Sequence, residues 1–129
     1  MPYPHDALAG KTILVAEDDY LLADTIDAEI RSAGGIVQGP FTSAKDALGS
    51  LLLGTPPPDA ATLNVQLSDG DSYPVADELT RRGIPFVFAS GNNPASVPSR
   101  FTRVAAVPKP YAAHQVVQAL VTLTHEEDR

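Results

Sequence analysis

The stretch Thr12-Ile13-Leu14-Val15-Ala16-Glu17-Asp18-Asp19 places an apolar run directly before three acids. Three later apolar runs are also followed directly by a polar residue that can take part in chemistry. Asn64 follows residues 60–63, Ser90 follows residues 85–89 and Lys109 follows residues 104–108. Short apolar runs bounded by turn residues are typical of buried strands. If these strands lie parallel in one sheet, their carboxyl ends meet at one edge, and the polar residues gather there.

Amphipathic stretches lie between the apolar runs, and this alternation predicts repeated β-α units around a parallel sheet. Strands are expected at about residues 11–16, 35–38, 59–64, 84–89 and 103–107. The predicted fold class is α/β, a doubly wound five-stranded parallel sheet in the flavodoxin-like order 2-1-3-4-5 with helices on both faces. The fourth helix is expected to be short or irregular, because Pro94 and Pro98 interrupt residues 92–100.

Length and composition restrict the class of protein. The 129 residues, 43% of them hydrophobic, suit a single domain over residues 1–129, with its core at about 10–124 and short polar tails. No apolar run approaches the roughly 20 residues that span a bilayer, and the N-terminus has no signal-peptide pattern. The absence of cysteine predicts a cytoplasmic protein without disulfides. A net charge of −7 argues against direct binding of nucleic acid.

Three adjacent acids repel one another unless a cation offsets them. A hard divalent ion such as Mg²⁺, or the amine of Lys109 from another strand end, is a suitable partner for Glu17 and Asp18. The plainer alternative is that the acids form a loop and helix-cap cluster, favoured by the helix dipole. The matching positions of Ser90 and Lys109 at other strand ends favour a functional site.

Four motifs together resemble the receiver domain of two-component response regulators: Val15-Ala16-Glu17-Asp18-Asp19, residues 64–70, Ala89-Ser90-Gly91 and Lys109-Pro110-Tyr111. The resemblance covers about residues 10–124. It implies that Glu17 and Asp18 are the metal-binding acids, Ser90 the switch hydroxyl and Lys109 the phosphate-binding lysine, while Asp19 begins the first helix. It also implies a stand-alone signalling module in a phosphorelay rather than an enzyme. Its partners would be a sensor histidine kinase, a phosphotransferase or another regulator.

The sequence departs from the family at the phosphoacceptor position, where Asn64 replaces aspartate. A neutral amide oxygen and a delocalised nitrogen lone pair are not useful nucleophiles. Loss of a unit charge about 4 Å from a metal forfeits about 1 kcal/mol in water and about 4 kcal/mol at an effective dielectric of 20. Mg²⁺ held by Glu17, Asp18 and a neutral oxygen of Asn64 is therefore expected to be weak or absent. Lys109 is expected to pair chiefly with Asp18 or Glu17, or to donate to the Asn64 oxygen.

Three explanations of Asn64 remain open. It is natural, and the domain signals by docking without phosphorylation. Alternatively, it is an engineered Asp-to-Asn substitution in an ordinary Mg²⁺-dependent, phosphoryl-accepting response regulator. In the third, Ser68, Asp69 or Asp71 accepts the phosphoryl group, although Asp69-Gly70 is typical of a turn. The first is favoured by the interrupted fourth helix and by Ala106, which stands where many receivers carry a switch aromatic.

Two further interpretations concern the histidines and the aromatic residues near the C-terminus. A metal-dependent hydrolase would need a base, and His5, His114 and His125 do not follow strands. One interpretation is a surface for partners, including a homodimer, formed by Phe101, Tyr111, Ala105 and Ala106. The other is that the two aromatic residues fill the gap left by a shortened helix. Exposure of the aromatic rings distinguishes these two.

Overall fold

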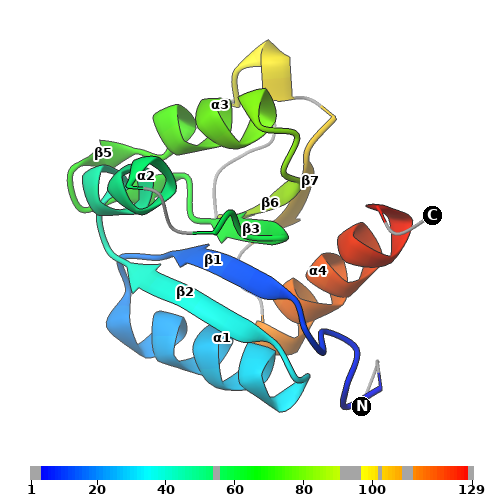
Figure 1. Cartoon of the computed structure of the whole chain (residues 1–129). Helices are drawn as coiled ribbons and strands as arrows, with labels where there is room; N and C mark the ends of the chain where they lie inside the picture. The colour runs from blue at the N-terminus through cyan, green and yellow to red at the C-terminus, as the bar shows by residue number, and fades with distance from the viewer. Residues whose placement is uncertain (1–3, 54–55, 91–96, 102, 109–111, 128–129) are drawn as a thin grey trace.

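The computed structural model describes residues 4–53, 56–90, 97–101, 103–108 and 112–127. Within these ranges, five parallel strands form one sheet (Figure 1). They are β1 (Thr12–Ala16), β2 (Ile36–Phe41), β3 (Ala60–Leu63), β6 (Phe86–Ser90) and β7 (Ala105–Pro108). Their order across the sheet is β2-β1-β3-β6-β7, which is 2-1-3-4-5 in chain order. The predicted fold class is confirmed.

Helices cover both faces of the sheet. In Figure 1, α1 (Tyr20–Ser32) and α4 (Ala113–Glu127) lie on one face, and α2 (Ala44–Leu52) and α3 (Tyr73–Arg81) on the other. Each face has its own buried apolar cluster, because the sheet separates the two layers. The first includes Ile26, Ile30, Val116, Val117 and Leu120, and the second includes Leu51, Val75, Leu79, Phe86 and Phe88.

Local sequence signals mark the starts of three helices. Asp19 is the N-cap of α1, and its carboxylate accepts a hydrogen bond from the Leu22 N–H at 3.1 Å. Ser43 caps α2 in the same way, accepting from the Asp46 N–H at 3.1 Å. Pro74 lies in the first turn of α3, where its missing N–H has no helical partner to lose. These features depend on neighbours in the sequence, so the sequence predicts them.

Two elements differ from the expectation. β2 continues to Phe41 instead of ending near residue 38, since an edge strand tolerates the Gly39-Pro40 pair that would break a central strand. A small antiparallel hairpin, β4 (Gln66–Leu67) with β5 (Gly70–Asp71), was not predicted. Strands of two residues are too short to show a periodic pattern.

The structure describes only part of the segment at the position of a fourth helix, since residues 92–96 lie outside the described ranges. The described part contains one 3₁₀ turn, η2 (Ser99–Phe101), which agrees with the prediction of a short or irregular fourth helix. The last helix begins at Ala113, and Tyr111 lies outside the described ranges. Among the helices of the described ranges, none has the length and apolar character required to cross a bilayer.

Candidate functional site

The site lies at the carboxyl edge of β1 and β3, the two strands at which the chain reverses its direction across the sheet. Ala16 and Leu63 are partners in the parallel register, so Glu17 and Asn64 leave the sheet side by side. The Asn64 N–H donates to the Ala16 carbonyl at 2.9 Å, which extends the pairing by one residue. The structure therefore brings together the positions that the sequence placed 47 residues apart.

The Asn64 amide connects two acids. Its Nδ2 donates to Oε2 of Glu17 at 2.9 Å and to Oδ1 of Asp18 at 3.1 Å. Its Oδ1 accepts from the Gln66 N–H at 3.4 Å. An ionised carboxylate only accepts hydrogen bonds, so an amide that contacts two of them presents its NH₂ group. In this arrangement Asn64 offers hydrogens to the acids, and its oxygen is directed to the backbone that follows.

The three acids have different environments. Glu17 is buried, with 1% of its surface exposed, and its Oε2 accepts a second hydrogen bond from the Asp19 N–H at 3.1 Å. Asp18 is exposed, and Asp19 caps α1. Asn64 is itself only 5% exposed. The hydrogen-bonded bridge that Asn64 makes between Glu17 and Asp18 therefore reaches from the interior to the surface. Asp19 begins the first helix, as predicted.

These side chains, as arranged, do not fit a hard cation. Mg²⁺ requires oxygen lone pairs in near-octahedral geometry. Two acids supply them, but the amide directs both of its Nδ2 hydrogens toward the same acids. Within the described ranges, no group of three His, Cys, Asp or Glu residues is arranged to hold a metal ion.

One further predicted position, Ser90, lies at the same edge of the sheet. Ser90 is the last residue of β6, and its backbone is the register partner of Pro108, the residue before Lys109. Lys109 lies outside the described residues. Its pairing with Asp18 or Glu17 therefore stays a prediction.

The loop after Asn64 is fastened to α2. The Asp69 carboxylate accepts from the Ala44 N–H at 2.7 Å and the Lys45 N–H at 3.0 Å, and these two donors hold the pKa of Asp69 below its ordinary value. The Ser68 N–H donates to the Thr42 carbonyl at 3.0 Å. The turn interpretation of Asp69 is confirmed by the β4–β5 hairpin. The sequence did not predict that Asp69 caps a helix that begins 25 residues earlier, because no local sequence pattern indicates such a contact.

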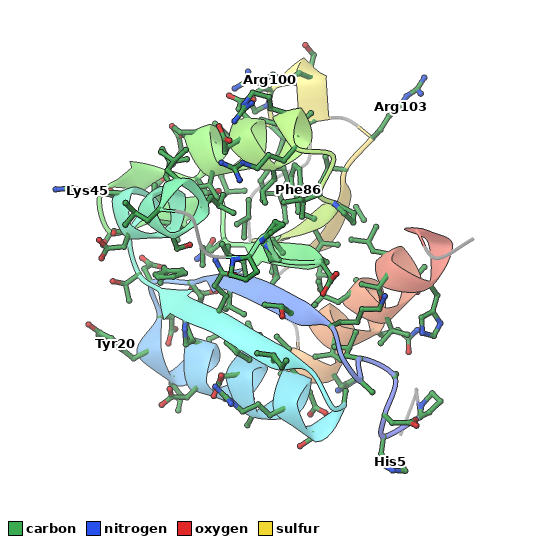
Figure 2. All side chains as sticks on the ribbon, in the orientation of Figure 1. His5, Tyr20, Lys45, Phe86, Arg100 and Arg103 are labelled. Carbon is green, nitrogen blue, oxygen red and sulfur yellow. The ribbon has the colours of Figure 1, made fainter. Side chains whose placement is uncertain are left out.

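The segment after β6 is held against α3. Phe101 is 3% exposed, and its ring centroid lies 5.6 Å from that of Tyr73 and 5.5 Å from that of Phe88. The Arg100 guanidinium lies 4.6 Å from the Phe101 ring centroid and donates two hydrogen bonds to Asp77, at 2.8 and 3.1 Å. In Figure 2, Arg100 lies on the outer side of the molecule, beside α3 and η2. Phe101 is thus buried among aromatic rings, as the filling interpretation expected, and is not exposed to a partner.

No protein-family model matches the sequence, and no curated protein matches it. Among solved structures, the chain is similar to SdrG from Sphingomonas melonis Fr1, with 36% identity, a TM-score of 0.73, and coverage of 91% of this chain and 97% of SdrG. A BeF3-activated conformation of SdrG from Pseudomonas melonis Fr1 matches with 35% identity, a TM-score of 0.71, and coverage of 90% and 98%.

A more distant likeness supports the fold. A CheY-like response regulator receiver domain protein from Methanospirillum hungatei JF-1 is 19% identical, with a TM-score of 0.78 and coverage of 92% of this chain and 96% of that one. The edge geometry at Glu17 and Asn64 and the similarity to SdrG over nearly the whole of both chains agree with the receiver motifs. This chain belongs to the receiver domains of two-component response regulators.

Proposed function

We propose that this receiver takes part in two-component signalling without accepting a phosphoryl group at position 64, and that it acts by docking to other proteins. The observation that carries the proposal is the arrangement of Asn64 at the acceptor position. Its NH₂ group is directed at Glu17 and Asp18, and its oxygen accepts from the Gln66 N–H. Neither amide atom carries a charge.

Phosphoryl transfer to a receiver requires an oxygen nucleophile that attacks phosphorus while the bond to the donor breaks. A carboxylate does this with a full negative charge and becomes an acyl phosphate. The Asn64 nitrogen is conjugated with its carbonyl, and both of its hydrogens are used by the acids. The proposal also includes weak or absent Mg²⁺ binding at this edge, because the amide directs its hydrogens at the two acids that would bind the ion.

The two acids among the alternative acceptors on the following loop have structural contacts of their own. Both carboxylate oxygens of Asp69 accept hydrogen bonds from the first turn of α2. Asp71 accepts from the Tyr73 N–H at 3.1 Å, at the start of α3. Transfer to either acid would give up these contacts, which supports a receiver without a substitute acceptor among them.

Labelling with radioactive acetyl phosphate in the presence of Mg²⁺ tests the proposal. We expect no stable label on the wild-type protein and a label on Asn64→Asp, because that change restores a carboxylate at the end of β3. Asn64→Ala is the control for transfer to Ser68, Asp69 or Asp71. Stable label on the wild-type chain that disappears in Asn64→Ala would overturn the proposal. An unlabelled Asn64→Asp would indicate that other groups of the pocket no longer support transfer.

Beryllofluoride provides a second readout that needs no covalent bond. SdrG adopts a BeF3-activated conformation. In this chain, we expect the amide NMR spectrum to be unchanged by beryllofluoride with Mg²⁺, whereas the spectrum of Asn64→Asp should shift around β3 and β6. The partners in this proposal are a sensor kinase, a phosphotransferase or another regulator. They would bind the same conformation whether or not a phosphodonor is present.

A further inference from the structure

We infer that the Asn64 amide takes the structural role that a divalent cation would have between Glu17 and Asp18, so that the acid pair is held together without metal. The two acids need a positive or hydrogen-donating partner, because one of them is almost fully buried. The amide supplies one hydrogen to each acid, at 2.9 and 3.1 Å. This role is separate from the loss of a nucleophile, which follows from any uncharged residue at this position.

The bridge has a fixed orientation. The NH₂ group faces two acceptors that have no hydrogen to offer, and the Oδ1 faces a backbone N–H that has no lone pair to accept with. Turning the amide by 180° would place its oxygen against two carboxylates and its NH₂ against the Gln66 N–H. All three contacts would then be repulsive, so the observed orientation is the stable one while the acids are ionised.

The bridge is also tied to the frame of the fold. The Asn64 N–H bonds to Ala16 at the end of β1, and Glu17 Oε2 receives the Asp19 N–H as well as the amide. The Glu17 N–H donates to the Phe41 carbonyl of β2 at 2.9 Å. The backbone groups of Glu17 and Asn64 thus join the carboxyl ends of β1, β2 and β3, and the side-chain bridge lies on this backbone frame. A cation would have to displace the amide from both acids in order to bind between them.

Replacing the amide by a carboxylate should reverse this dependence. Asn64→Asp places a third acceptor against Glu17 and Asp18, so three acids repel one another until a cation is added. We expect the melting temperature of the wild-type protein to be the same in EDTA and in millimolar Mg²⁺. The melting temperature of Asn64→Asp should be lower than that of the wild type in EDTA, and it should rise as Mg²⁺ is added.

Two controls separate the bridge from charge and from folding defects. Gln66→Glu adds the same charge at an exposed side chain two residues away and should show little response to Mg²⁺. NMR of the wild-type protein needs no destabilised variant. The side-chain NH₂ signals of Asn64, assigned by their loss in Asn64→Asp, should not move during a Mg²⁺ titration.

Saturable movement of the Asn64 NH₂ signals with Mg²⁺, or a wild-type melting temperature that rises as much as that of Asn64→Asp, would overturn the inference. Whether the protein accepts a phosphoryl group is decided by the labelling experiment with acetyl phosphate alone. A wild-type protein that does not respond to Mg²⁺ but takes up a label that Asn64→Ala loses refutes the proposed function and leaves the bridge standing. One that binds Mg²⁺ but stays unlabelled refutes the bridge and the expected weakness of Mg²⁺ binding, and leaves the proposed absence of phosphoryl transfer standing.

Discussion

At the scale of the residue, aspartate and asparagine have nearly the same shape but opposite hydrogen-bonding capacity on one arm of the side chain. The exchange at position 64 removes a negative charge, and it also adds two hydrogens in a place surrounded by acceptors. Under the proposed function the first change removes the nucleophile, and the second gives Glu17 and Asp18 hydrogen-bond donors. A single side chain would then account for both the proposed loss of phosphoryl transfer and the pairing of the acids that remain.

Asn64→Ala should destabilise the protein, because it removes both donors and leaves the buried Glu17 with fewer hydrogen bonds. Loss of a partner to a buried polar group costs about 1 to 3 kcal/mol. Urea unfolding followed by circular dichroism measures the difference in the free energy of unfolding. A variant as stable as the wild type would mean that the amide hydrogen bonds contribute nothing to folding.

At the scale of the element, two segments are held by side chains from distant parts of the chain. The hairpin after β3 is joined to α2 through Asp69, and η2 is joined to α3 through Arg100 and Phe101. The two contacts of η2 differ in kind. Arg100 and Asp77 are about half exposed, so solvent screens their attraction, whereas Phe101 is buried among rings. Burial of the Phe101 ring should therefore contribute more than the Arg100–Asp77 ion pair to holding η2 against α3.

Phe101→Ala should lower the free energy of unfolding by about 3 to 5 kcal/mol, the usual range for truncation of a buried phenylalanine. Arg100→Ala, one residue away, should change it far less, because its ion pair with Asp77 is exposed. Denaturant titrations of the two variants give the comparison. Equal losses would contradict the view that ring packing, rather than the ion pair, holds η2 on α3.

The end of α3 should make stability depend on pH. Arg81 and then Arg82 donate hydrogen bonds to Glu78 and lower the pKa of Glu78 from 4.5 to about 2. Because the folded pKa is depressed, this stabilisation is complete above pH 4.5 and is lost as the pH falls toward 2. Between these values, the melting temperature of the wild type should fall more steeply than that of Glu78→Gln. Asp24→Asn, at an exposed position of α1, is the matched control and should follow the wild type.

At the scale of the whole molecule, the site and the core occupy different regions. Apolar clusters on the two faces of the sheet contain the large buried side chains, while the acids and Asn64 lie past the carboxyl ends of β1 and β3. Receiver folds owe their stability chiefly to such burial. One side chain at the edge can therefore differ without disturbing the buried clusters that stabilise the fold.

The sequence by itself determined the strand order, the helix caps at Asp19 and Ser43, and the meeting of positions 17, 18 and 64 at one edge. These follow from apolar periodicity, local capping and the direction of parallel strands. Only the tertiary structure decided that the Asn64 amide turns its NH₂ toward the acids, that Asp69 caps α2 and that Phe101 is buried. Such contacts depend on distances between residues far apart in the chain, and residue order does not encode those distances in any local pattern.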